Sequence, residues 1–161
     1  MKEPTADYRG FTFFINLEFP SHRIDMKAIC YISNFARDLN KHQISELIET
    51  VNCNNIRENI TGILIIRNKQ FFQILEGENR VINQMYKKIR SDKRHSTIIK
   101  LLDITIDGRI FSDYNSGKFE VFQKYANLKK LYLYFNWIKE AEYLPADGII
   151  KLTTNFLKQS K

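Results

Sequence analysis

The chain has few cysteines, glycines and prolines, and each shortage excludes a class of protein. Its two cysteines, Cys30 and Cys53, have no metal-ligand spacing and cannot build a disulfide framework. We therefore expect reduced, buried thiols in a cytoplasmic protein. The six glycines are scattered and form no phosphate-cradling loop. Low glycine and proline content, together with 43% hydrophobic residues, also argues against a disordered chain.

Long apolar runs and catalytic motifs are missing as well. No apolar segment reaches the roughly 18 residues that span a bilayer, and the N-terminus has no signal-peptide pattern. The sequence contains no nucleophile elbow and no HExxH motif. Its three histidines, His22, His42 and His95, lie far apart and do not indicate a metal site. The sequence therefore predicts neither an enzyme nor a metalloprotein.

The chain is basic, with a formal net charge of +7. Residues 118–161 hold eight lysines and four acidic residues, so this segment alone contributes +4. A solvated surface accounts for such a pattern, and a basic nucleic-acid-binding module is the alternative. The predicted strands lack the Lys/Arg-Gly-aromatic consensus of RNA-binding sheets, which disfavours that alternative without excluding it.

Hydrophobic periodicity predicts an α+β fold. The expected order is β-α-β-β-α-β-β, a ferredoxin-like sheet with two helices on one face. The tail, residues 126–159, predicts two C-terminal helices separated by Pro145 that pack on the other face. The predicted strands cover residues 27–33, 60–66, 70–75, 101–108 and 117–122, and the predicted helices cover residues 43–54 and 79–91.

The chain is expected to divide into three segments. Residues 1–25 form an N-terminal extension, residues 26–122 form the domain, and residues 123–161 form a C-terminal helical segment. The extension is too apolar to be an idle solvated tail, so we expect it to pack, for example as an added strand. Its large apolar residues are Phe11, Phe13, Phe14, Ile15, Leu17 and Phe19.

A glutamine in an apolar strand is the first candidate for a functional residue. Alternation along QFFQILEG places Phe71, Gln73 and Leu75 on one face of the strand. A buried amide without a partner costs roughly 1–3 kcal/mol, so Gln73 should have a partner, and Tyr31 in the first strand is a good candidate. By itself this pair is better explained by an ordinary hydrogen bond in the core than by a functional site.

The combination of several motifs resembles the BLUF family, which senses blue light with a flavin. Their order and spacing match that family over about residues 27–120. The resemblance implies a noncovalently bound flavin, usually FAD although FMN is possible. The matching motifs are CYIS (30–33), NNIRENITGIL (54–64), FFQILEG (71–77), VINQMYKKIRSDKRH (81–95) and RIF (109–111).

The resemblance also implies a role for individual residues. Tyr31 corresponds to the photoactive tyrosine and Gln73 to the glutamine that switches. Leu47 and Ile89 correspond to aliphatic residues on either side of the flavin ring, and Asn55 to the asparagine that hydrogen-bonds it. The remaining cofactor-binding candidates, around the ring edge, ribityl chain and phosphates, are Asn54, Phe71, Lys88, Asp92, Arg94 and His95.

The mechanism implied by the resemblance involves no net chemistry. After blue-light excitation Tyr31 gives up an electron and then a proton, and Gln73 rearranges by rotation or tautomer change. Tyr114 and Ser116 replace the tryptophan and methionine that usually relay the signal. We expect Ser116 to hydrogen-bond Gln73 directly. A scaffold that binds flavin but is photochemically silent remains an alternative.

The resemblance is to the short, stand-alone type of the family. The C-terminal segment shows no cyclase, phosphodiesterase or helix-turn-helix pattern. Receptors of this type act by binding partner proteins and commonly form homo-oligomers. We therefore expect an effector protein, whose identity the sequence leaves open, and neither a membrane nor nucleic acid as the partner.

Overall fold

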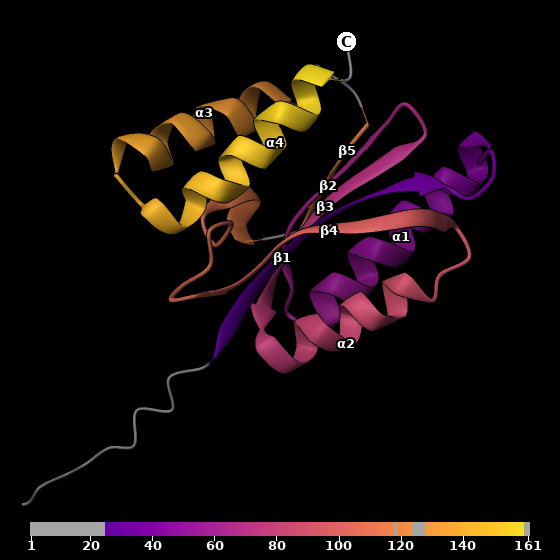
Figure 1. The fold of residues 1–161 in the computed structure, drawn as a ribbon, viewed down its shortest axis with the longest axis horizontal. Helices are drawn as coiled ribbons and strands as arrows, with labels where there is room; N and C mark the ends of the chain where they lie inside the picture. The colour runs from indigo at the N-terminus through magenta and orange to yellow at the C-terminus, as the bar shows by residue number, and fades with distance from the viewer. Residues whose placement is uncertain (1–24, 118, 124–127, 160–161) are drawn as a thin grey trace, which may run out of the picture.

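A five-stranded sheet lies between two pairs of helices (Figure 1). The computed structural model describes residues 25–117, 119–123 and 128–159, without the side chains of Asn115 and Ser116. The strand order is β4-β1-β3-β2-β5, and only β2 and β5 pair in parallel. The elements are β1 (Met26–Phe35), α1 (Lys41–Arg57), β2 (Thr61–Arg67), β3 (Gln70–Glu78), α2 (Asn79–Arg90), β4 (His95–Ile106), β5 (Glu120–Phe122), α3 (Leu128–Glu140) and α4 (Asp147–Gln159), with short 3-10 turns at Tyr114–Gly117 and Leu144–Ala146.

The two faces of the sheet form two separate hydrophobic cores. Phe71 and Leu75 of β3 pack with helices α1 and α2, whereas Phe72 and Ile74 pack with α3 and α4. The rings of Phe72 and Phe156 stack at 4.9 Å and join α4 to the sheet. Because β3 is covered on both faces, its sequence is a nearly continuous apolar run. The predicted ferredoxin-like sandwich with C-terminal helices on the second face is confirmed.

Local signals account for several element boundaries. Asn40 begins α1 with a capping box, in which its side chain accepts a hydrogen bond from the Gln43 backbone and the Gln43 side chain accepts one in return. In β2, Gly62 has a φ of 134°, and a Cβ there would lie 2.1 Å from the carbonyl oxygen of Ile74. Only glycine fits this close approach of two strands.

Some predicted boundaries were wrong. Helix α1 continues to Arg57 rather than ending at residue 54, and β4 begins at His95 rather than at residue 101. The polar start of β4 pairs with the end of β1, as His95 lies opposite Phe35, so tertiary pairing extends a strand beyond its apolar run. Residues 1–24 lie outside the described part of the chain, so the packing predicted for the extension is not tested.

The structure tests the prediction that both cysteines are reduced and buried. Both cysteines are free, as predicted, but only Cys30 is buried, and the prediction of a buried Cys53 was wrong. Cys53 faces away from the sheet because the apolar stripe of α1 lies on the opposite side of the helix.

None of the helices described is both long and apolar enough to cross a membrane.

Candidate functional site

A cavity of about 230 Å³ lies between α1, α2 and the sheet face that they cover. All eleven cofactor-binding residues predicted from the sequence line this cavity. They come from three strands, two helices and the loop before β4, so the fold assembles one site from distant segments. The eleven are Tyr31, Leu47, Asn54, Asn55, Phe71, Gln73, Lys88, Ile89, Asp92, Arg94 and His95.

The cavity walls are apolar and come from the two helices. Leu47 of α1 is 2% exposed, and Ile89 of α2 packs against the same core. Met85 and Val51, one helical turn before Ile89 and after Leu47, extend the two walls. A slot with two aliphatic walls and a few polar groups at its edge suits a flat aromatic ligand.

Tyr31 and Gln73 face each other across adjacent strands. They are directly opposite in the antiparallel pairing of β1 and β3, and the Tyr31 hydroxyl donates a hydrogen bond to Oε1 of Gln73. Tyr31 is fully buried and Gln73 is 4% exposed. Burial raises the pKa of the Tyr31 hydroxyl above its ordinary value, so the phenol is neutral at physiological pH.

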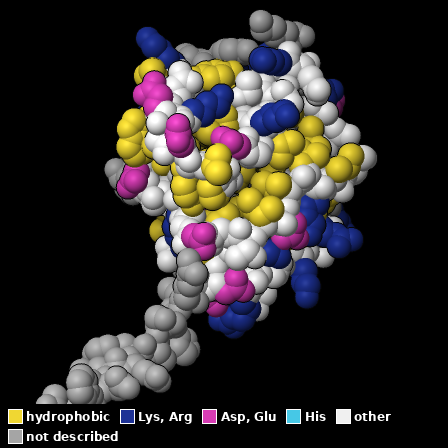
Figure 2. All heavy atoms as spheres, turned by 60° about the vertical axis from the view of Figure 1, so that its left-hand side comes forward, with side chains coloured by type: hydrophobic (Ala, Val, Ile, Leu, Met, Phe, Trp, Pro, Cys, Tyr) yellow, Lys and Arg dark blue, Asp and Glu magenta, His cyan; other side chains and the backbone are white. Residues whose placement is uncertain are grey.

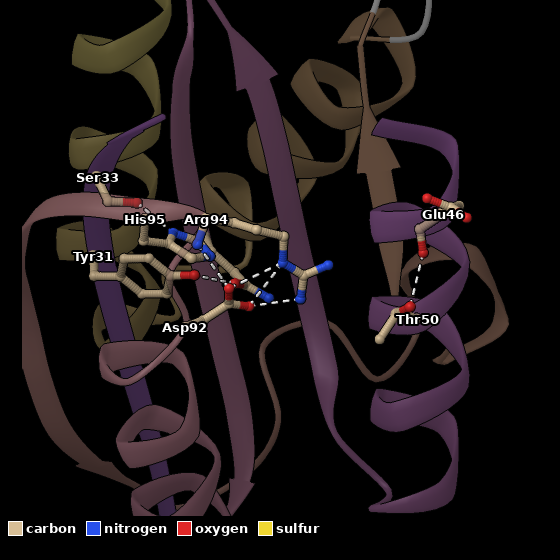
Figure 3. A network of polar contacts seen from close by, with 8 residues as sticks. Tyr31, Ser33, Glu46, Thr50, Asp92, Arg94 and His95 are labelled. Carbon is tan, nitrogen blue, oxygen red and sulfur yellow. Dashed lines mark hydrogen bonds and ion pairs between the residues drawn. The ribbon is translucent and has the colours of Figure 1, made fainter. Parts of the chain in front are cut away.

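A second cluster of polar side chains is centred on Asp92, at the end of the cavity near β4 (Figure 3). Nε of Arg94 donates to Asp92 at 3.0 Å, and Nη2 donates to the same carboxylate at 2.6 Å. Burial opposes the charge of Asp92, but the hydrogen bonds and charge of Arg94 lower the net pKa below its ordinary value. Nδ1 of His95 lies 2.8 Å from the Ser33 hydroxyl, and burial lowers the pKa of His95, which favours the neutral ring.

Asn55 provides the sign that the cavity is built to hold a ligand. The residue is 2% exposed and lines the cavity, yet its Nδ2 has no hydrogen-bond partner among the residues that the structure describes. Buried amide groups are nearly always paired, so an unpaired donor beside a cavity indicates that a bound molecule supplies the acceptor. Asn54, its neighbour, instead accepts a hydrogen bond from Arg57 at 3.0 Å.

Four lining residues were missed: Thr50, Val51, Leu64 and Met85. Val51 and Met85 lie on the apolar helical stripes that were recognised, so their spacing could have identified them. No sequence signal marks Thr50, which lies across the cavity from the Asp92 group (Figure 3).

Of the two expected relay residues, Tyr114 does not line the cavity. Tyr114 is buried on the opposite face of the sheet, where its ring contacts Tyr134 at 5.0 Å and Phe111 at 6.1 Å. The side chain of Ser116 lies outside the described residues, so its predicted hydrogen bond to Gln73 is not tested. Tyr114 therefore belongs to the core beneath α3 and α4 rather than to the Gln73 site.

Comparison with known families agrees with this geometry. Residues 26–117 match the family model called BLUF, described as sensors of blue-light using FAD. The chain belongs to the BLUF family. Its matched domain is thus a blue-light sensor that uses a flavin, as predicted.

Relatives of this BLUF chain include both curated proteins and solved structures. It is 32% identical over 77 residues to the blue light- and temperature-regulated antirepressor BluF of Escherichia coli, covering 48% of this chain and 19% of that protein. It is 27% identical over 147 residues to photoactivated adenylate cyclase subunit alpha of Euglena gracilis, covering 85% and 14%. The chain therefore spans less than a fifth of the length of either relative.

Solved BLUF structures share the fold. A structure of the BLUF domain of BlrP1 superposes with a TM-score of 0.63 at 23% identity, covering 82% of this chain and 89% of that one. A bacterial light-regulated adenylyl cyclase superposes with a TM-score of 0.56 at 30% identity, covering 74% and 36%. The first of these likenesses supports the fold alone.

Proposed function

We propose that this BLUF chain binds FAD noncovalently in the cavity between α1 and α2 and senses light through Tyr31 and Gln73. The observation that carries the proposal is the buried hydrogen bond from Tyr31 to Gln73 at the cavity wall. A phenol is the side chain most suited to give up an electron and a proton together, and its partner is an amide that can both donate and accept.

The residues around the cavity fit a flavin. Leu47 and Ile89 would cover the two faces of the ring, and the unpaired Nδ2 of Asn55 would donate to a ring oxygen. Lys88 and Arg94 supply positive charge for phosphate groups, which FAD and FMN both carry. We assign FAD because the family description names it.

The chain's own residues account for the switching step. A bound flavin excited by blue light supplies a strong one-electron oxidant. Loss of an electron to the flavin would make the phenol of Tyr31 strongly acidic, and its proton would move along the existing hydrogen bond toward Oε1 of Gln73. Electron and proton would then return to Tyr31, so that no net oxidation remains. Rotation or tautomerisation of the amide would change which group Gln73 presents to Tyr31. Two hydrogen-bond arrangements of similar energy form a two-state element of the kind that a local signal can bias.

We propose that the change leaves the site through β3 and the helices on the far face. Phe72, next to Gln73 in β3, stacks on Phe156 of α4, so a shift of β3 would displace α4. Tyr114 would act within the core beneath α3, and Ser116 would act on Gln73. Replacing Ser116 with methionine should change the rate of dark recovery, and an unchanged rate with unchanged output would argue against that role.

An effector protein and a second copy of the chain are the proposed partners. Apolar side chains gather on one face of the molecule (Figure 2). On α3, Leu133 is 61% exposed and Trp137 is 57% exposed, which is unusual for side chains of this size. Light scattering over a range of concentrations tests self-association, and a constant monomer mass would contradict it.

Absorption spectra before and after a blue flash test the main proposal. The parent should show a flavin spectrum that shifts slightly to the red and recovers in the dark. Tyr31→Phe and Gln73→Ala should keep the flavin and lose the shift. Tyr86→Phe is a matched control, since its ring lies 5.8 Å from that of Tyr31 but Tyr86 does not line the cavity. A colourless protein that also fails to bind added FAD would refute the proposal.

A further inference from the structure

Strand β4 is an exposed edge of the sheet. It is 12 residues long and, among the described residues, pairs only with β1. Alternate backbone N–H and C=O groups of β4 therefore point away from β1 with no strand opposite them. Ile99 is 52% exposed and Leu101 is 39% exposed along this edge. A long edge with exposed apolar side chains is a template for another strand unless something covers it.

One face of β4 is apolar. Residues directly opposite each other in an antiparallel pair point to the same side of the sheet. Ile99 and Ile104 lie opposite Ile32 and Ala28, which pack in the core beneath α3 and α4. A strand added beside β4 would therefore extend this core if its own side chains on that side were apolar.

The other face of β4 is polar except for Ile98, which packs against the core beneath α1 and α2. Lys100 and Asp103 lie opposite Tyr31 and Ile29, which belong to the core beneath α1 and α2. Asp103 forms ion pairs with Lys27 at 2.7 Å and with Lys100 at 2.5 Å. A complementary strand would thus carry apolar side chains on one face and mainly polar ones on the other.

The N-terminal extension contains a segment with this pattern. Over residues 11–19 every second position is apolar, and the positions between them are threonine, phenylalanine, asparagine and glutamate. Apolar residues at every second position over nine residues, with Phe14 as the one apolar residue between them, are typical of a strand with one buried face. The apolar positions are Phe11, Phe13, Ile15, Leu17 and Phe19.

We propose that residues 11–19 form a sixth strand on the free edge of β4 and cover its apolar face. The chain enters β1 at Met26, which lies opposite Ile106 at the end of β4. Residues 20–24 must cross about two strand spacings, roughly 10 Å, and five extended residues reach about 17 Å. The added strand then runs parallel to β4 and antiparallel to β1.

The proposed connection must pass the end of β4 without crossing the segment that leaves β4. The carbonyl of Asp25 accepts a hydrogen bond at 2.8 Å from the backbone of Asn79, so the chain enters on the side of α2. After β4 the chain turns to the opposite side, where Ile110 and Phe111 are buried beneath α3 and α4. The two connections therefore pass on different faces and do not cross.

Hydrogen exchange of the β4 amides, followed by NMR on the full chain in the dark, tests the sixth strand. Ile15→Lys places a charge on the apolar face, and Phe14→Lys places the same charge on the other face. In the parent, outward-facing amides within residues 98–105 should exchange at least about tenfold more slowly than in Ile15→Lys, because each ladder bond must open first. Phe14→Lys should retain the parent rates. Deletion of residues 2–19 should cause the same faster exchange as Ile15→Lys. This deletion is used in place of Ile15→Lys if that variant does not fold.

Two results would overturn the proposal. Equal exchange rates in the two lysine variants would mean that the apolar face of residues 11–19 does not cover β4. Protection that increases with protein concentration would mean that a second copy occupies the edge. The experiment requires no photochemistry, so its outcome is independent of the proposed light response.

Discussion

The carboxylate of Glu76 joins β3 to the loop that follows β4, and glutamine at this position tests how strongly it does so. Glu76 is fully buried. Its Oε1 accepts hydrogen bonds from the Phe111 N–H at 2.6 Å and the Thr61 hydroxyl at 2.7 Å, and its Oε2 accepts one from the Ile110 N–H at 2.8 Å. Two oxygens thus serve three donors.

Glutamine keeps only one of these oxygens. Its amide nitrogen would face the Ile110 N–H, so two buried donors, that N–H and the amide's own, would have no acceptor, at about 1–3 kcal/mol each. Burial raises the pKa of Glu76, which shows that its charge is held at a cost, so removing the charge offsets part of this loss. We expect Glu76→Gln to lower the free energy of unfolding by about 2–4 kcal/mol, a large part of the roughly 5–15 kcal/mol typical of a domain.

Urea unfolding followed by far-UV circular dichroism measures this difference. Glu78→Gln is the matched control, because Glu78 is exposed, ends the same strand and, within the described part of the chain, makes only a surface ion pair with Arg80 at 3.6 Å. That change should shift the free energy by less than about 0.5 kcal/mol. Equal unfolding midpoints for the two variants would refute the reasoning, because Glu76 would then not anchor residues 110–111.

Two further predictions concern the cavity. Asn55→Ala should weaken FAD binding by about 2- to 12-fold, the equivalent of one hydrogen bond, in a flavin-fluorescence titration. Asn52→Ala, on the same helix but outside the cavity, should leave the affinity for FAD unchanged. Equal affinities of the two variants would mean that Asn55 does not bind the flavin. Burial lowers the pKa of His95, so below about pH 6.5 the unfolded chain binds a proton more readily and stability falls as the pH decreases. His95→Gln should reduce the dependence of the urea midpoint on pH, whereas His42→Gln, at an exposed position, should keep it. Equal pH dependence in the two variants would mean that His95 is not the group responsible.

Much of the fold could be predicted from the sequence because the spacing of apolar residues within each helix or strand is a local property. The apolar runs of β2 and β3, the stripes of α1 and α2 and the break at Pro145 are all properties of short segments. Motif spacing identified eleven of the fifteen lining residues, since the family resemblance carried information on tertiary structure that periodicity lacks. Without it, Gln73 was only a buried amide that needed a partner.

The remaining features depend on contacts between distant parts of the chain. The strand register places Tyr31 opposite Gln73, 42 residues away, and pairing with β1 extends β4 back to His95. Packing against α3 places Tyr114 on the face away from the cavity. The sequence by itself determined the type and order of the helices and strands, because backbone preference and alternation are local, but not every boundary. Only the tertiary structure decided which side chains meet, because neighbours across a sheet are set by strand order and register.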